Sequence, residues 1–211
     1  NPNGDPDNAG FPRQRPDGKG EISPVSIKRK LRELVADKQG LIWLEMKQRL
    51  SLGAEADARF DILETRGRDR KAIIAKMQDG RFESDYWDGR LFGSTFLESR
   101  DAVEKDIERK LKADEWAKLQ KTIRSGAAHF GVGVSVSPVR TRFETWTNKA
   151  GVEEGKDRGL APQALKFVEH GIYTVPFFVN PTQARKTACT GDDVRLMLQL
   201  LKHSYRDNPS T

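Results

Sequence analysis

The stretch that decides the fold of this chain reads Ser26-Ile27-Lys28-Arg29-Lys30-Leu31-Arg32-Glu33-Leu34-Val35-Ala36. Its apolar residues lie at positions 27, 31, 34 and 35, which is the spacing of one face of an α-helix. Ser26 is of a type that often caps a first helical turn. Lys28, Arg29 and Arg32 fall on the opposite side, and Lys30 flanks the apolar stripe. We therefore predict an amphipathic helix that packs on a sheet by one face and presents cations on the other.

Strand patterns follow in the second half of the chain. In residues 127–137, Phe130 and three valines alternate with small or polar residues, and Pro138 ends the run. Gly131 and Gly133 share the small face, so another backbone or a nucleic acid could approach it closely. Residues 140–147 alternate again. Residues 171–180 form a further predicted strand, in which Pro176 indicates an edge or a bulge.

The remaining segments complete an α+β order. Residues 1–24 are rich in turn formers and predict a loop, residues 41–80 and 99–123 have interrupted helical patterns, and residues 81–97 predict a strand and a turn. A last helix starts at Thr190 with a capping-box pattern, and its predicted core stripe is Val194, Met197, Leu198, Leu201 and Tyr205. If a strand precedes Asn1, this order fits a ferredoxin-like sheet with insertions.

Composition narrows the class of protein. The 211 residues suit one domain with insertions. The single cysteine, Cys189, excludes a disulfide scaffold and fits a reducing compartment, so we expect a cytoplasmic protein. No apolar run approaches the roughly 20 residues needed to span a bilayer, and we expect no membrane association.

The basic charge is concentrated in two segments. There are 37 basic and 31 acidic residues, a formal net charge of +6. The surplus lies in residues 27–32 and in residues 118–149, where the cations are Lys118, Lys121, Arg124, Arg140, Arg142 and Lys149. Such stripes are typical of phosphate binding, although two solvated faces would give the same pattern. Lys28 and Arg32 are one helical turn apart, a spacing of about 6 Å that matches a nucleic-acid backbone.

Other chemistry has little support in the sequence. The loop with Asn3, Asp5, Asp7 and Asn8 faintly resembles a calcium loop, but Pro6 interrupts it and no Glu closes it, so a structured turn is the better interpretation. His129, His170, His203 and Cys189 have no nucleophile motif beside them. The glycines match neither a P-loop nor a dinucleotide fingerprint. We therefore expect no catalytic residues, no metal and no cofactor.

Several motifs together resemble a known family. The opening Asn1-Pro2-Asn3-Gly4-Asp5-Pro6-Asp7, followed by residues 26–32, is similar to the backbone subunits of type I CRISPR Cascade complexes, the Cas-seven family, with type I-C the nearest branch. The similarity continues at Trp87-Asp88-Gly89-Arg90-Leu91-Phe92-Gly93, Ile123-Arg124-Ser125-Gly126, Ser137-Pro138-Val139, His170-Gly171-Ile172-Tyr173 and the helix from Gly191 to Tyr205.

The resemblance implies a modified RNA-recognition-motif palm of the RAMP superfamily over residues 1–211, with helical fingers at about 41–122 and a thumb hairpin at about 145–169. It aligns Ser23, Lys28 and Arg32 with contacts to the guide backbone. Asn3, Gly4 and Asp5 lie in the loop beside that track, and Arg124 and Ser125 in a second contact region. Arg29, Arg140 and Arg142 join these candidates because they belong to the two basic segments.

The implied function is a non-catalytic subunit that polymerises along CRISPR RNA in antiviral defence. Its partners would be the CRISPR RNA, target DNA paired to that guide, further copies of itself and other Cascade subunits. A scaffold of this kind holds phosphates and leaves sequence recognition to base pairing. Two alternatives remain open: an RNA-cleaving member of the same superfamily that uses His129, His170 or Asp5, and a calcium-dependent adaptor.

Overall fold

The computed structural model describes residues 3–65, 69–94, 99–120, 124–148 and 161–208. The chain forms two compact units, one from residues 1–26 and 131–176 and the other from residues 27–130 and 177–210. Helices and small antiparallel sheets are both present, which agrees with the predicted α+β class. Among the described residues, no helix is long and apolar enough to cross a membrane.

The first unit is built on a three-stranded antiparallel sheet. Its strands are β1 (Lys19–Ile22), β5 (Gly133–Pro138) and β8 (Tyr173–Thr174), in the order β1-β5-β8. The prediction of a loop over residues 1–24 is wrong at β1, because residues 13–21 form a hairpin. Glu21 N donates to Arg13 O at 2.9 Å, and Gly18 supplies the positive φ of 79° at the turn.

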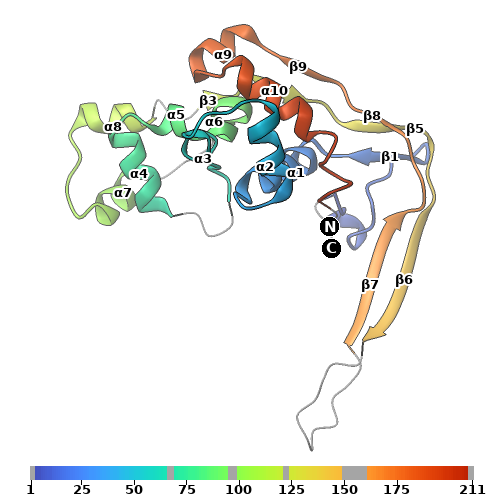
Figure 1. The fold of residues 1–211 in the computed structure, drawn as a ribbon. Helices are drawn as coiled ribbons and strands as arrows, with labels where there is room; N and C mark the ends of the chain where they lie inside the picture. Colours follow the sequence, from blue (N-terminus) through green and yellow to red (C-terminus); the bar gives the residue numbers. More distant parts are fainter. Residues whose placement is uncertain (1–2, 66–68, 95–98, 121–123, 149–160, 209–211) are drawn as a thin grey trace, which may run out of the picture. The chain divides into compact units, whose positions relative to one another are not determined.

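A two-stranded ribbon also belongs to the first unit. Strands β6 (Thr141–Asn148) and β7 (Ala161–Val168) pair antiparallel over their whole length, from Thr141↔Val168 to Asn148↔Ala161 (Figure 1). This confirms the strand predicted at 140–147. Residues 149–160, the central part of the segment expected as a thumb hairpin at about 145–169, lie outside the described residues.

The strands predicted at 127–137 and 171–180 are each divided in two. The first becomes β4 (Ala128–Phe130) and β5, and the second becomes β8 and β9 (Phe177–Val179). Both divisions fall at one point, where Gly131 N donates to Pro176 O at 2.8 Å. The predicted close approach at the glycine face is to backbone and side chains of the same unit: a Cβ on Gly133 would lie 2.8 Å from Val175 Cγ2.

The second unit is mainly helical. Its helices are α1 (Pro24–Ala36, whose first turn lies in the first unit), α2 (Leu41–Arg49), α3 (Ala56–Arg59), α4 (Arg70–Gln78), α5 (Phe82–Asp85), α6 (Trp87–Phe92), α7 (Arg100–Asp106), α8 (Ala113–Gln120), α9 (Pro181–Thr187) and α10 (Gly191–Leu200). Two short antiparallel pairs join them: β2 (Gly93–Ser94) with β3 (Arg124–Ser125), and β4 with β9.

Three predictions about these helices need correction. The strand predicted around Phe82 and Tyr86 is wrong, because these residues recur with helical spacing and their ring centroids lie 5.2 Å apart at α5; among the described residues of this segment, a strand is present only at Gly93–Ser94. Helix α1 begins at Pro24 rather than after Ser26, since Ser23 Oγ accepts from Ser26 N at 3.2 Å. The apolar stripe predicted for this helix is confirmed, because Ile27, Leu31, Leu34 and Val35 are all buried.

The phase of α10 differs from its predicted stripe. The capping box is confirmed, with Thr190 and Asp193 bonded reciprocally. However, Leu198 and Tyr205 are exposed, and the buried side chains are Leu196, Met197 and Leu200. The reason is that Asp193 is itself fully buried in an ion pair with Arg90, which turns this face of the helix inward.

Candidate nucleic-acid interface

Three of the motif segments meet in the second unit, around α1, α6 and β3. Gly93 and Gly126 make this possible, because the two backbone segments that contain them cross with almost no space between them. A Cβ on Gly93 would lie 2.6 Å from Arg124 O, and a Cβ on Gly126 would overlap the backbone of Phe92 and Gly93. The sequences around Trp87–Gly93 and Arg124–Gly126 therefore need glycine where they cross.

Asp88 connects α6 to the basic helix. Its carboxylate is completely buried, and its Oδ2 accepts from Arg32 Nε at 2.8 Å. The same carboxylate accepts from the backbone N–H groups of Leu63 at 2.7 Å and Glu64 at 3.1 Å. The predicted cationic face is therefore wrong in part at Arg32, because this side chain is only 17% exposed and pairs with a buried carboxylate. Within the described residues, Nε is the only donor of Arg32 with a hydrogen-bond partner, so the Nη edge of its guanidinium has none.

Phe92, at the end of α6, holds two cations. Lys28 Nζ lies 5.4 Å from the centroid of its ring, and Arg32 Cζ also lies 5.4 Å from that centroid. A cation over an aromatic face is attracted by the ring quadrupole, so Phe92 fixes both side chains at neighbouring positions. Asp88 and Phe92 together orient Arg32, and Phe92 alone orients Lys28.

Lys28 has an electrostatic environment that favours an anionic ligand. Burial and, secondarily, the charge of Arg32 lower the pKa of Lys28 below 10.5. Within the described part of the chain, no carboxylate forms an ion pair with Lys28. A half-buried ammonium that faces a second cation is stabilised by an anion placed between the two.

The other two cations of α1 are engaged within the chain. Arg29 Nε forms an ion pair with Glu33 at 2.7 Å, and both side chains are partly exposed. Lys30, predicted to flank the stripe, is only 1% exposed, and its Nζ donates to Asn208 O. Of the four basic residues, Arg29 and Lys30 are therefore bound within the chain. Among the described residues, Lys28 contacts no carboxylate or carbonyl group, and Arg32 contacts only the carboxylate of Asp88.

Arg124 and Ser125 lie on β3, which pairs with the residues directly after Phe92. The guanidinium of Arg124 donates to Lys186 O and to the carboxylate of Glu83. Ser125 is exposed and pairs with Gly93. The tertiary structure thus brings this predicted second contact region to the same end of α6 as Lys28 and Arg32.

The other predicted residues lie in the first unit. The amide of Asn3 bridges Glu21 O at 2.6 Å and Ser23 N at 2.8 Å, so it ties the opening loop to the start of α1. Gly4 forms a bridge with Pro12. Asp5 caps the short 3₁₀ helix Pro6–Asn8 and lies 3.7 Å from Arg13. The described part of the opening motif is therefore a structured turn, and the side chains of Asn3 and Asp5 hold it to later residues of the first unit.

Arg140 and Arg142 are exposed at the start of the β6–β7 ribbon. Arg142 forms ion pairs with Glu169 at 2.8 Å and Glu144 at 3.5 Å.

The histidines and the acidic loop were the alternative chemical centres. His129 stacks on Phe178 at 4.9 Å, and the buried His203 pairs with the exposed Asp207 at 2.7 Å on the turn after α10. Among the described residues, no group of three His, Cys, Asp or Glu side chains could hold a metal ion.

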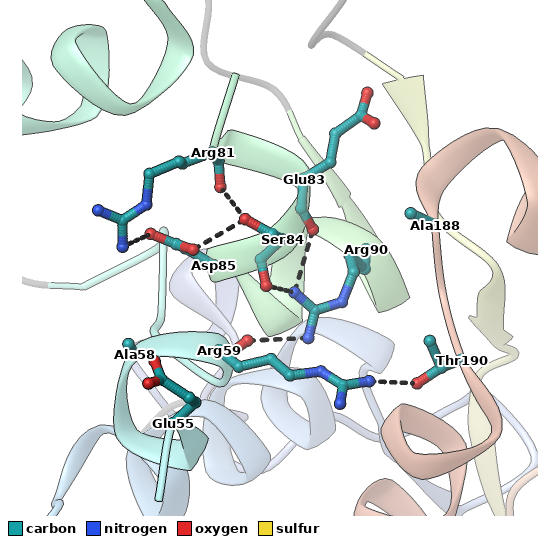
Figure 2. A pocket seen from close by; sticks show the side chains of 10 residues that line it. All are labelled: Glu55, Ala58, Arg59, Arg81, Glu83, Ser84, Asp85, Arg90, Ala188 and Thr190. Atoms are coloured by element: carbon teal, nitrogen blue, oxygen red, sulfur yellow. Dashed lines mark hydrogen bonds and ion pairs between the residues drawn. The ribbon is translucent and has the colours of Figure 1, made fainter. Parts of the chain in front are cut away.

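A pocket of about 480 Å³ lies elsewhere in the second unit (Figure 2). Two of its arginines have local partners: Arg81 forms an ion pair with Asp85 at 3.0 Å, and Arg59 donates to the hydroxyl of Thr190 at 3.2 Å. Arg90 donates to the backbone at Glu83, Ser84 and Arg59 and forms a buried ion pair with Asp193. None of the predicted site residues lines this pocket, and its network stabilises α5, α6 and α10.

Sequence reasoning missed Asp88 and Phe92. Both belong to the motif Trp87–Gly93, but a strand and turn in this segment gives neither side chain a predicted contact with the basic helix. A helical interpretation of residues 87–92 would have placed Asp88 and Phe92 one turn apart on one face, where both can contact α1.

Comparison with known proteins establishes the family. A family model described as CRISPR-associated protein Cas7 matches residues 1–211. The chain is therefore a CRISPR-associated protein. Specifically, it belongs to the Cas7 family, as the resemblance of its motifs predicted.

A solved chain described as "CRISPR RNA-guided surveillance complex, pre-nicking" is 18% identical to this chain, and the alignment covers 93% of this chain and 68% of that one with a TM-score of 0.38. No curated protein matches the chain.

Proposed function

We propose that this chain is a non-catalytic backbone subunit of a type I CRISPR surveillance complex (Cascade), and that its copies assemble along a CRISPR RNA. Membership of the Cas7 family supports this role. Target DNA would be recognised by pairing with the guide, so the subunit needs to hold phosphates and needs no contact with base edges. Other Cascade subunits would complete the particle.

One observation carries the proposal: Lys28 and Arg32 share the ring of Phe92, and both keep donors that no group in the described residues accepts. The free edge of a guanidinium matches two oxygens of one phosphate, and the ammonium binds as a point charge. Because both side chains are already oriented, phosphate binding costs little side-chain entropy. Such contacts have no preference for base sequence.

In the same proposal, residues of about 145–169, which include most of the β6–β7 ribbon, are the thumb, residues of about 41–122 are helical fingers, and the remainder is an RNA-recognition-motif-like palm. Ser125 and Arg124 would extend the phosphate track from Arg32. Arg29, Arg140 and Arg142, together with the loop of Asn3, Gly4, Asp5 and Ser23, remain secondary candidates.

The test is RNA affinity of the full chain with Lys28→Ala, measured on several unrelated sequences over a range of salt concentrations. We expect a uniform loss across sequences and a salt slope shallower by about one unit. Lys47→Ala is the matched control, because Lys47 is also a helical lysine near an aromatic ring, 5.9 Å from Trp43, but has a carboxylate partner in Asp57 at 3.1 Å.

Unchanged binding in Lys28→Ala, or equal losses in both variants, would contradict the phosphate site. Purification of the chain with a discrete small RNA and several protein copies per RNA would support the assembly. RNA cleavage by the purified complex that is lost in His129→Ala would refute the non-catalytic role.

A further inference from the structure

The short ribbon β4–β9 has two aromatic faces. Its register places Phe130 opposite Phe177 and His129 opposite Phe178. Directly opposed residues of an antiparallel pair lie on the same face, and successive residues alternate. Phe130 and Phe177 therefore share one face, with ring centroids 5.6 Å apart, and His129 and Phe178 stack on the other at 4.9 Å.

The Phe130 face continues into the proposed phosphate site. The ring of Phe130 lies 6.2 Å from that of Phe92, and Phe92 carries the cations of Lys28 and Arg32. A continuous row of rings thus runs from Phe92 through Phe130 to Phe177. It begins beneath two cations and ends at a phenylalanine that is 43% exposed.

A row that combines cations with an exposed ring selects among anionic ligands. A small inorganic anion would bind the cations and leave Phe177 in water. A single-stranded nucleic acid has both complements, since its phosphates meet the cations and its bases or sugars have flat faces that pack on aromatic rings. The separation of neighbouring rings along the row is within the reach of one nucleotide and the next.

We propose that Phe177, which packs beside Phe130 on one face of the ribbon, is a stacking surface for a base or ribose of the nucleic acid whose phosphates bind Lys28 and Arg32. This inference rests on the proposed function and adds a contact that is independent of charge. The ring is rigid and already positioned, so it contributes to affinity without selecting a base.

Phe177→Ala and Phe178→Ala form a matched pair for the test. The two residues are adjacent, both are exposed (43% and 62%), and they lie on opposite faces of one ribbon. Binding of a uridine homopolymer to the full chain is measured for each variant at several salt concentrations. We expect Phe177→Ala to weaken binding by about five- to a hundredfold, with an unchanged salt slope, and Phe178→Ala to change it by less than about twofold.

Two further variants separate stacking from folding. Phe177→Leu keeps apolar volume but has no ring, so it should fold normally and lose affinity like the alanine variant. Phe177→Tyr keeps an aromatic ring at this position, so its RNA affinity should equal that of the wild type. Equal affinity of wild type, Phe177→Ala and Phe177→Leu, while Lys28→Ala binds more weakly, would refute the stacking surface and leave the phosphate site intact. If Lys28→Ala is also unaffected, both proposals fail. Loss of self-association with RNA affinity unchanged would instead identify this face as an interface between copies.

Discussion

The buried carboxylate of Asp88 provides the sharpest test of how the basic helix is held. It accepts three hydrogen bonds, from Arg32 Nε and from the backbone N–H groups of Leu63 and Glu64. Asp88→Ala removes all three acceptor contacts at once and leaves the Arg32 guanidinium without its carboxylate. We expect a loss of about 3–5 kcal/mol in the free energy of unfolding, the range for breaking a buried pair from one side.

Arg32→Ala should be less damaging, because Asp88 keeps its two backbone donors. The variant loses one charge-assisted hydrogen bond, worth about 1.5–3 kcal/mol, and the contact of Arg32 with the ring of Phe92, worth about 0.5–1 kcal/mol. The loss in Arg32→Ala should therefore be smaller than the loss in Asp88→Ala by about 1 kcal/mol. The measurement is urea denaturation of the wild type, both single variants and the double variant. Equal losses in the single variants, or strictly additive losses in the double variant, would refute the reasoning.

A second set of variants, Asp88→Asn alone and Asp88→Asn combined with Arg32→Ala, shows whether Asp88 orients Arg32 for RNA. If it does, Asp88→Asn should weaken RNA binding in the wild type but not in the Arg32→Ala background, since the residue to be oriented is gone. An equal effect of Asp88→Asn in both backgrounds would mean that Asp88 supports the fold alone.

Two further predictions concern pH and the chain crossing. Burial lowers the pKa of Lys38 from 10.5 to about 8. Between those pH values the unfolded chain binds more protons at this residue than the folded chain, so the contribution of Lys38 to stability rises with pH. Urea midpoints measured from pH 7 to 10.5 should therefore rise in the wild type relative to Lys38→Met, and a constant difference between the two proteins would contradict the pKa shift. Gly126→Ala should destabilise the chain by about 1–3 kcal/mol or prevent folding, because its Cβ would overlap the Phe92–Gly93 backbone. Gly53→Ala, where a Cβ meets nothing within 4 Å, should leave the thermal midpoint nearly unchanged, and equal melting of both variants would rule out the overlap.

Local sequence patterns were sufficient to predict features that depend on residues of a single helix or strand. The apolar spacing of residues 27–35 correctly predicted the buried stripe of α1, and Thr190 with Asp193 correctly predicted the N-terminus of α10. Both features depend on residues within about two turns of helix. The strand at 140–147 was predicted for the same reason, since alternation is read along one segment.

Long-range contacts account for the errors. The core phase of α10 follows from the buried pair of Asp193 with Arg90, residues far apart in sequence. The division of the strands at Gly131 follows from its hydrogen bond to Pro176. Residues 82–92 were interpreted as a strand and turn, although their helical spacing allows them to pack on α1 and α10.

The sequence by itself determined that the chain is an α+β protein of basic character, with a helix that separates apolar from cationic residues and with the motifs of the Cas7 family. Only the tertiary structure decided which intramolecular contacts each of the four cations in residues 28–32 makes. Lys30 is buried and Arg29 is paired, whereas Phe92 and Asp88 position Lys28 and Arg32. The physical reason is that a charge pattern fixes how many cations a helix face has, while the availability of each depends on carboxylates, carbonyls and rings supplied by distant segments.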